Sequence, residues 1–352
     1  MKTELVKISE KLDRKDLENI KRAGEILKTG GLVSFPTETV YGLGANGLDE
    51  TAVRKIYKAK GRPSDNPLIL HISSIDQLDE LAEEVSPEAR RAMDAFWPGP
   101  ITFILKKKAS IPELITGGLD TVAVRMPDHD LARRILEAAG VAIAAPSANT
   151  SGRPSPTRAE HVMEDLSGKI DMLVDGGPSG IGIESTVLDL SGDIPLILRP
   201  GKITIEEIRK VLENVEEDKS IIKQDIVPKS PGQKYRHYAP SGEMVLFTGG
   251  IDSIIKEMSK RSKEDLKRGR KVAILATDET LASYDLDDEI IIRSLGSRRD
   301  EETIAANLFS CLRELDSLGV EKIYAEGTGY DDLGMAIMNR MIKAADGNIV
   351  SL

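Results

Sequence analysis

The chain has 352 residues, which corresponds to about two domains of ordinary size. Its formal net charge of −10 argues against a protein whose main task is to hold nucleic acid, since such binding depends on neutralising phosphates. The single cysteine, Cys311, excludes an internal disulfide, and no apolar run is long enough to span a bilayer, so we expect a soluble, cytoplasmic protein.

The first expected elements are a helix over residues 16–28 and a strand over residues 32–35. The strand leads into PTETVYGLGANG, whose three glycines match the G-x-G-x-x-G pattern of dinucleotide-binding folds. That pattern requires an acidic residue at the end of the second strand, whereas the candidate here, Asp65, precedes that strand. A dinucleotide site is therefore the disfavoured interpretation.

The stretch KAKGRPSDNPLILHI, residues 58–72, predicts a helix end, a polar loop and a strand in that order. The loop region carries Lys60, Arg62, Ser64, Asp65 and Asn66. Lys60 and Arg62 suit a di- or triphosphate or a carboxylate, Arg62 through its planar fork and Lys60 as a point charge. The alternative is a solvated helix end whose cations complement the helix dipole.

Further strands are expected over residues 101–105, 121–125 and 141–144, with helices over residues 75–85, 87–96 and 131–139. The last of these strands leads into APSANTSGRPSPT, which is crowded with hydroxyl, amide and guanidinium groups. Such a loop can cradle a phosphate or can be a plain surface turn, and the residues alone leave both open. Strands over residues 184–190 and 197–198 follow, the second leading directly to Arg199.

Regular periodicity fails over residues 215–242, which contain PKSPGQKYRHYAPSG. A pure spacer would be uniformly rich in Gly and Ser or in Pro, whereas this segment also holds tyrosines, a histidine and several cations. We therefore favour a lid that folds over a ligand, with an extended linker as the alternative.

From residue 243 onward, apolar strands alternate with amphipathic helices, which predicts a mainly parallel sheet covered on both faces. The expected strands lie over residues 244–247, 272–277, 289–295 and 322–326, and the expected helices over residues 251–266, 303–318 and 334–345. The tripeptide Gly327-Thr328-Gly329 could hold a ligand at the carboxyl edge of the sheet, although a structural or regulatory role is favoured.

The motifs of several common catalytic centres are missing from the sequence, among them G-x-x-x-x-G-K-[ST], H-E-x-x-H and G-x-S-x-G. Cations and hydrogen-bond donors gather instead at strand ends and adjoining loops: Lys60, Arg62, Arg125, Arg199 and the 147–155 loop. Converging cations and donors are what nucleotidyl transfer requires, because positioning and charge neutralisation carry that catalysis.

Five ordered motifs resemble the YrdC-like threonylcarbamoyl-AMP synthase family: FPTETVYGLG, KAKGRPSDNPLILHI, PSAN at residues 146–149, SGIGIESTV and LRPG. SPGQKYRHYAP and the appended α/β domain match the longer, two-domain form. The resemblance implies a catalytic domain over residues 1–214, a linker or lid over 215–242 and a C-terminal domain over 243–352. The first would be a twisted mixed sheet with helices around a concave basic cavity, and the last a smaller Rossmann-like three-layer α/β domain with a mainly parallel sheet.

The resemblance also implies a reaction, in which L-threonine, bicarbonate and ATP give threonylcarbamoyl-AMP and pyrophosphate. The threonine amine would attack bicarbonate, and the carbamate oxygen would then attack the α-phosphorus of ATP, with Mg²⁺ accompanying the pyrophosphate. A downstream threonylcarbamoyl transferase would pass the group to an adenosine of tRNA, so contact of this chain with tRNA is expected to be weak or indirect.

The residues that the resemblance assigns fall into three groups. The catalytic signature falls on Lys60, Arg62, Ser147 and Asn149. ATP would contact Arg62, Asn66, Thr121, Ala145, Ser147, Ser155 and Arg199, joined by Tyr235 or His237 from the lid. L-Threonine would lie near Thr37, His71, Arg125 and Ser185. The metal ligands are not indicated.

Two other functions compete with this one. A double-stranded RNA-binding or ribosome-associated module would use the concave basic surface, although the net acidity of the chain counts against it. A carbamoyl transferase that uses carbamoyl phosphate is the second, and consumption of threonine during product formation would distinguish it from the synthase.

Overall fold

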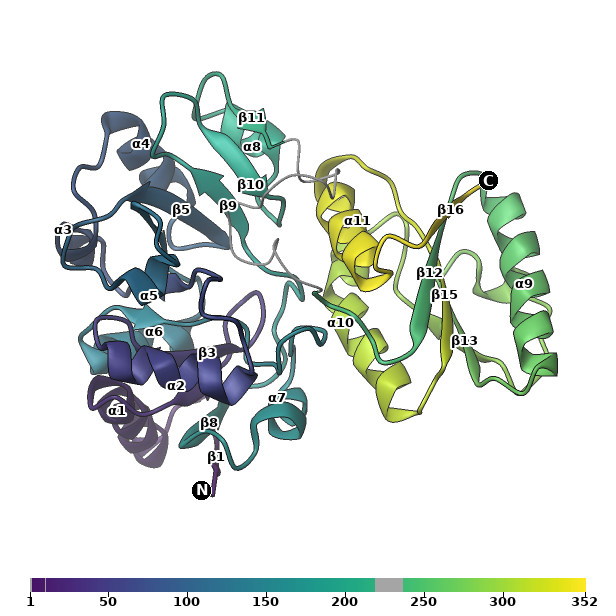
Figure 1. Cartoon of the computed structure of the whole chain (residues 1–352), viewed down its shortest axis with the longest axis horizontal. Helices are drawn as coiled ribbons and strands as arrows, with labels where there is room; N and C mark the ends of the chain where they lie inside the picture. Colours follow the sequence, from purple (N-terminus) through teal and green to yellow (C-terminus); the bar gives the residue numbers. More distant parts are fainter. Residues whose placement is uncertain (1, 10, 219–236) are drawn as a thin grey trace. The chain divides into compact units, whose positions relative to one another are not determined.

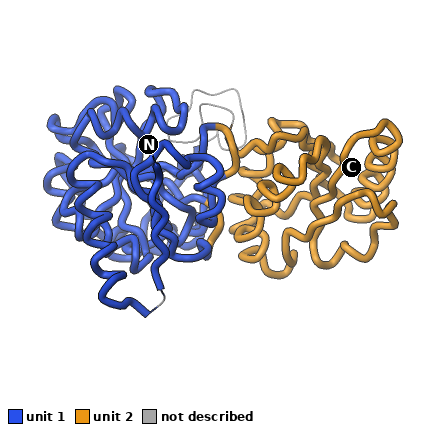
Figure 2. Tube along the Cα trace, turned by 90° about the horizontal axis from the view of Figure 1, so that it is seen from below, with its two compact units in different colours: residues 1–151, 155–180, 184–234 blue, residues 152–154, 181–183, 235–352 orange. Residues whose placement is uncertain are grey.

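The computed structural model describes residues 2–9, 11–218 and 237–352. The chain divides into two compact units that interleave in sequence (Figure 2). The N-terminal unit comprises residues 1–151, 155–180 and 184–234, and the C-terminal unit comprises residues 152–154, 181–183 and 235–352. Most of the predicted lid over residues 215–242, including Tyr235, lies outside the described residues.

The N-terminal unit is built on a mixed sheet, which has eleven strands in the described part of the chain (Figure 1). Their spatial order is β1 (Glu4–Lys7), β8 (Met172–Asp175), β2 (Val33–Phe35), β3 (Gly42–Asn46), β7 (Ile143–Ala144), β4 (Ile69–His71), β6 (Thr121–Arg125), β5 (Ile101–Lys106), β9 (Thr186–Asp189), β10 (Leu196–Arg199) and β11 (Glu216–Glu217). β4 runs parallel to β6, whereas β7 and β5 run antiparallel to these neighbours, so the centre of the sheet is mixed.

The helices of this unit are α1 (Arg14–Lys28), α2 (Glu50–Lys60), α3 (Leu78–Leu81), α4 (Pro87–Phe96), α5 (Glu113–Thr116), α6 (Asp130–Ala139), α7 (Ala159–Leu166) and α8 (Ile205–Arg209). The apolar stripes of α1 and α6 share one core with strands of the sheet. These two helices approach closely because Gly24 has no side chain: a Cβ there would lie 2.6 Å from that of Ala138. The single predicted helix over residues 75–85 is wrong, since a 3₁₀ turn at Ile75–Gln77 precedes the four-residue α3.

The glycine-rich segment after β2 is part of a buried strand, β3, and does not form a phosphate-binding turn. A Cβ at Gly44 would lie 2.8 Å from the Phe35 ring and 3.0 Å from side-chain atoms of Leu27 and Ile143. Glycine is needed here because large apolar side chains fill the space beside the strand. The dinucleotide interpretation is therefore excluded by the packing of the core.

The C-terminal unit has a sheet of five parallel strands in its described residues. Their spatial order is β14 (Ile291–Ser294), β13 (Val272–Ala276), β15 (Lys322–Glu326), β12 (Glu243–Thr248) and β16 (Ile349–Ser351). The helix α9 (Ile251–Lys267) covers one face, while α10 (Glu301–Ser317) and α11 (Asp332–Ala344) cover the other (Figure 1). The predicted fold class, a mixed sheet followed by a three-layer α/β domain, is confirmed.

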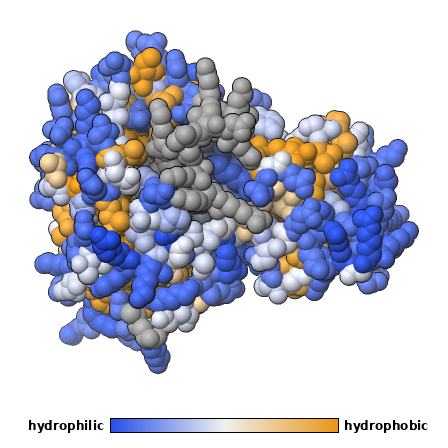
Figure 3. All heavy atoms as spheres, viewed as in Figure 1, coloured by the Kyte–Doolittle hydropathy of each residue, from blue (hydrophilic) through white to orange (hydrophobic). Residues whose placement is uncertain are grey.

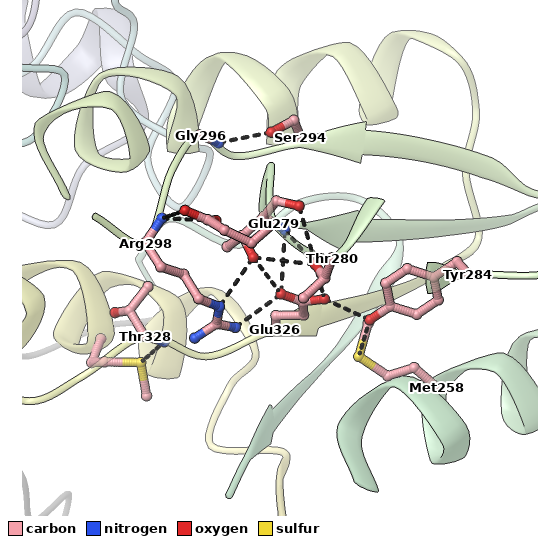
Figure 4. A network of polar contacts seen from close by, with 11 residues as sticks. Met258, Glu279, Thr280, Tyr284, Ser294, Gly296, Arg298, Glu326 and Thr328 are labelled. Carbon is pink, nitrogen blue, oxygen red and sulfur yellow. Dashed lines mark hydrogen bonds and ion pairs between the residues drawn. The ribbon is translucent and has the colours of Figure 1, made fainter. Parts of the chain in front are cut away.

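A buried carboxylate fastens the carboxyl edge of this second sheet (Figure 4). Glu326, at the end of β15, is 0% exposed, and its Oε1 accepts hydrogen bonds from Thr280 Oγ1 at 2.6 Å and Tyr284 Oη at 2.7 Å. The other oxygen accepts from Thr277 Oγ1 at 2.9 Å and Arg298 Nη2 at 2.9 Å. The carboxylate thus joins the end of β15 to the two loops that follow β13 and β14, and a structural role fits this edge of the sheet.

The Glu326→Gln variant is expected to destabilise the C-terminal unit by about 2–4 kcal/mol, because the amide loses the ion pair and turns one acceptor into a donor facing other donors. Hydrogen exchange in β13 and β15 should become faster. The fluorescence of Trp97, the only tryptophan and a residue of the N-terminal unit, should keep its unfolding midpoint. Glu257→Gln is the matched control, since Glu257 is partly exposed and pairs locally with Arg261 on α9; equal stability of both variants would contradict this role for Glu326.

Most of the molecular face drawn in Figure 3 is hydrophilic, in keeping with a charged share of 30%. None of the helices within the described ranges is both long and apolar enough to cross a membrane. The same residues include no group of three or more His, Cys, Asp or Glu side chains that could hold a metal ion.

Candidate active site

Three of the four predicted catalytic residues form one cluster, in which Lys60 and Asn149 are buried and Ser147 is half-buried. Lys60 ends α2, where Gly61 takes the left-handed conformation that stops the helix, and its side chain is turned inward with only 1% of the residue exposed. Its Nζ donates to the backbone oxygen of Ser147 and, at 2.6 Å, to that of Asn149. Ser147 Oγ in turn donates to Asn149 Oδ1 at 2.6 Å. The ammonium group therefore holds the 147–149 loop in its fold.

Backbone contacts fix the same loop from its other side. Pro146 O accepts from Leu43 N, and Ala148 N donates to Tyr41 O, each at 2.8 Å. Ser147 also forms a β-bridge with Gly42, at the start of β3. The loop is thus clamped between a strand and the end of a helix, as a pre-organised binding element would be.

Arg62 and Asn66 lie in the loop that follows α2. Arg62 Nη2 donates to the backbone oxygen of Pro67 at 3.1 Å. Asn66 is 2% exposed, and among the described residues its Oδ1 has no hydrogen-bond partner. A buried acceptor without a donor is costly, so this oxygen is suited to a donor group of a ligand.

Arg125, the last residue of β6, ties the PTET segment to the sheet. Its Nη1 donates to Thr39 Oγ1 at 2.9 Å, and its Nη2 lies 2.6 Å from Glu38 Oε1 but is not aligned for a hydrogen bond. Thr37 Oγ1 donates to the backbone oxygen of Val40 at 2.7 Å and lies 2.8 Å from Thr39 Oγ1, so the Thr39 hydroxyl must donate to Thr37. The Arg125 guanidinium is held in place by Thr39 and by its ion pair with Glu38.

His71, the last residue of β4, lies beside Arg125 in the register of the sheet. Its Nδ1 is 3.3 Å from the backbone oxygen of Ile69, and a carbonyl oxygen can only accept, so Nδ1 carries the hydrogen. Burial, followed by the positive charge of Arg125, lowers the pKa of His71 to about 3. The imidazole is therefore neutral at physiological pH and offers polar contacts without charge.

This shift predicts a pH dependence of stability. Below about pH 6.5 His71 is protonated in the unfolded chain but stays neutral in the folded chain. The free energy of unfolding therefore falls as the pH is lowered from 6.5 towards 3. In His71→Gln, the difference in unfolding free energy between pH 7.5 and pH 5 should shrink by about 2 kcal/mol. Urea unfolding followed by Trp97 fluorescence measures this, and an unchanged pH difference would contradict the buried neutral imidazole.

Ser185, which directly precedes β9, is held by two neighbours. Arg199 donates through Nε to the Ser185 backbone oxygen at 3.0 Å and through Nη2 to its Oγ at 3.1 Å. Thr102 Oγ1 lies 2.8 Å from the same Oγ. The adjacent Glu184 accepts from Ser155 Oγ at 2.5 Å. These contacts place Ser155, Ser185 and Arg199 near the start of β9.

The strand register of the N-terminal sheet places the predicted site residues near the two ends of β6. Thr121 and Arg125 open and close β6, four residues or roughly 13 Å apart, and share a face because side chains alternate along a strand. His71, Thr102, Ser185 and Arg199 belong to the Arg125 end. Ala145 lies opposite Ile69, beside the middle of β6, and Asn66 precedes β4 on the Thr121 side. Between them lies an apolar cluster that includes Ile69, Ile104, Ala123 and Val187. The face therefore offers two polar ends joined by an apolar floor.

Some predictions remain outside this arrangement. Tyr235 lies outside the described residues. His237 belongs to the C-terminal unit, where its ring lies 5.6 Å from that of Tyr238. Sequence reasoning missed Glu38, Thr39, Thr102 and Glu184, which contact the predicted residues. Of these, Thr39 alone had a signal, the alternating hydroxyls of PTET, while the other contacts depend on the tertiary fold.

Models of two protein families match the chain. The family described as "Telomere recombination", which covers Sua5, YciO and YrdC domains, matches residues 25–201. The threonylcarbamoyl-AMP synthase C-terminal domain matches residues 203–346. Together they account for both the mixed sheet and the parallel sheet.

Relatives that match nearly the whole chain belong to the same family. The threonylcarbamoyl-AMP synthase of Pyrococcus abyssi is 46% identical and is covered over 96% of its length by 95% of this chain. That of Bacillus subtilis is also 46% identical, over 99% of this chain and 100% of the relative. The structure of P. abyssi Sua5 complexed with L-threonine matches with a TM-score of 0.93 at 45% identity, over 99% of this chain and 100% of that one. Such relatives define an enzyme that forms an adenylate from ATP. The chain belongs to the threonylcarbamoyl-AMP synthase family.

Proposed function

We propose that the chain forms threonylcarbamoyl-AMP and pyrophosphate from L-threonine, bicarbonate and ATP. The observation that carries the proposal is the sheet face with two polar ends, one at His71 and Arg125 and the other at Asn66 and Thr121. Their spacing of roughly 13 Å gives room for an amino acid and a nucleotide end to end. The family and the threonine complex of the P. abyssi relative support this assignment.

Threonine binds at the Arg125 end in this proposal. The Arg125 guanidinium, which is ion-paired with Glu38, binds the substrate carboxylate, a charge-assisted contact that Lys could not reproduce in the same planar geometry. Neutral His71 and Ser185 flank it, and neither adds a charge that would compete with the ammonium or amine of the substrate. Thr37 lies close to this end, with its hydroxyl donating to Val40 O and accepting from Thr39, so it supports the shape of the site.

ATP binds at the other end, between Asn66, Thr121 and the 147–149 loop. Asn66 Oδ1 accepts a hydrogen bond from the nucleotide, and Arg62 faces its phosphates. Lys60 acts through the loop that it folds, because Ser147 O, Asn149 O and the more distant Asn149 Oδ1 at 3.4 Å take up its three hydrogens. Lys60 is therefore a positioning residue in this proposal.

The chemistry needs no covalent intermediate with the protein. The threonine amine attacks bicarbonate and releases water to give the carbamate. A carbamate oxygen then attacks the α-phosphorus, and pyrophosphate leaves with the Mg²⁺ that entered as MgATP. Excluding water protects both the carbamate and the mixed anhydride. The product would pass to a threonylcarbamoyl transferase that modifies tRNA, with tRNA contacting this chain weakly or indirectly.

Incubation with ATP, L-threonine and ¹⁴C-bicarbonate tests the proposal. A labelled adenylate should form, and it should disappear when any one of the three substrates is omitted. Labelled product from carbamoyl phosphate without threonine would indicate a carbamoyl transferase instead. Steeply salt-dependent binding of double-stranded RNA without any adenylate would favour the RNA-binding alternative.

A further inference from the structure

The helix α10 is buried along two stripes. Its apolar stripe, which has the spacing of a core-facing side, consists of Ile304, Leu308, Leu312 and Leu315, all 0% exposed. A second stripe with the same spacing consists of the buried Ala305, Phe309 and Arg313 and the partly buried Asp316, whose side chain is 5% exposed. It includes two charged residues. Buried charges need specific partners, so the second stripe points to defined contacts.

Arg313 has one such partner in the 152–154 segment. It is 2% exposed, and its Nε and Nη2 donate to the backbone oxygen of Pro154 at 3.0 and 2.7 Å. The preceding Gly152 offers its oxygen to Ala239 N at 2.9 Å, which is a second tie to the C-terminal unit. The segment is therefore fixed by the C-terminal unit although its neighbours in sequence belong to the N-terminal unit.

The 181–183 segment rests on the same helix. A Cβ at Gly182 would lie 2.4 Å from the backbone oxygen of Ala305 and 2.4 Å from the Cα of Ala306. Gly182 also has a φ of +83°, which other residues rarely adopt. Only glycine allows the backbone of this segment to lie directly against the helix, so its path is set by α10.

Both segments lead straight into the active-site residues. Ser155 follows Pro154, and Glu184 follows residues 181–183; the two side chains are joined by the 2.5 Å hydrogen bond. We propose that α10 positions Ser155 and Glu184, and thereby the nucleotide-binding hydroxyl of Ser155. It does so through the hydrogen bonds of Arg313 and the close packing of Gly182 against the helix. The C-terminal domain would then serve catalysis by fixing two chain segments at the site. This inference rests on the proposed function, which places ATP at Ser155.

The test compares Arg313→Met with the wild-type full-length chain. Methionine keeps an apolar stem but leaves Pro154 O without these donors. The KM for ATP should rise about tenfold with a smaller change in kcat, because a displaced binding group weakens nucleotide binding. Hydrogen exchange over residues 155–157 and 184–187 should become faster, while the strands of the C-terminal unit keep their protection.

Matched variants separate positioning from mere stability. Glu314→Gln lies next to Arg313 on α10, and its partner is the half-exposed Arg293, so it should leave KM and exchange unchanged. Arg313→Lys retains a donor and should fall between wild type and Arg313→Met. Gly182→Ala, which acts through the other segment, should reproduce the exchange pattern of Arg313→Met.

A lowered melting temperature of Arg313→Met with unchanged KM and unchanged local exchange would overturn the inference, since a purely structural role predicts that result. Failure of the wild-type chain to form the adenylate would instead overturn the proposed function. In that case the exchange of the two segments would still report whether α10 positions them.

Discussion

Replacing Lys60 with methionine is expected to lower the rate of threonylcarbamoyl-AMP formation by about a hundredfold to a thousandfold. Methionine fills most of the buried volume but cannot donate to Ser147 O and Asn149 O, which Lys60 Nζ contacts. Two carbonyl groups then lose their donor at about 1–3 kcal/mol each, so the 147–149 loop should shift towards water. The adenylate assay measures the rate, and Trp97 fluorescence measures the stability of the N-terminal unit.

Lys58→Met provides the control for this prediction. Lys58 lies two residues earlier on α2 and is exposed, so the same chemical change should leave both rate and stability unaltered. Near-wild-type activity of Lys60→Met would show that the loop keeps its fold without the ammonium group. The positioning role of Lys60 would then be wrong.

Replacing Arg125 with glutamine should raise the KM for threonine by a hundredfold or more, because the charge-assisted contact to the substrate carboxylate is lost. The same change leaves Glu38, whose side chain is 13% exposed, without the cation 2.6 Å away. Breaking one half of such a buried pair costs about 3–5 kcal/mol. The variant should therefore lose both threonine affinity and stability, and these two effects can be separated.

The double variant Arg125→Gln with Glu38→Gln makes the separation. Removing both charges should restore much of the stability, since no buried charge is left without a partner. Threonine affinity should stay low, because the guanidinium is still missing. Full recovery of the threonine KM in the double variant would show that Arg125 does not bind the substrate and that its single substitution acted through folding alone.

Local sequence patterns were enough to predict many of the helices and strands. The strands at Thr121–Arg125 and Lys322–Glu326 agree with the predicted ranges, because apolar runs bounded by turns specify strands with little help from the rest of the chain. The glycines of β3 were ambiguous, since the same residues serve a phosphate turn or a crowded core. Only the position of the Phe35 ring, a tertiary contact, decides between them.

The candidate site was predictable in its residue types and not in its contacts. A lysine at a helix end is usually exposed, so the inward turn of Lys60 towards Asn149, 89 residues later, has no local signal. The contact of Arg125 with Thr39 spans 86 residues and likewise depends on sheet register. Motifs predicted which residues belong to the site, whereas the contacts between distant residues are seen only in the three-dimensional structure.

The seating of residues 152–154 and 181–183 on α10 has a consequence for biosynthesis. During translation, both segments leave the ribosome well before the helix that carries Arg313 has been made. The N-terminal half can form its sheet early, but these two stretches stay unanchored until nearly the whole polypeptide has emerged. A nascent chain would therefore acquire nucleotide affinity late. A gene shortened after residue 218 would encode the N-terminal sheet without α10, so residues 152–154 and 181–183 would have no helix to pack against.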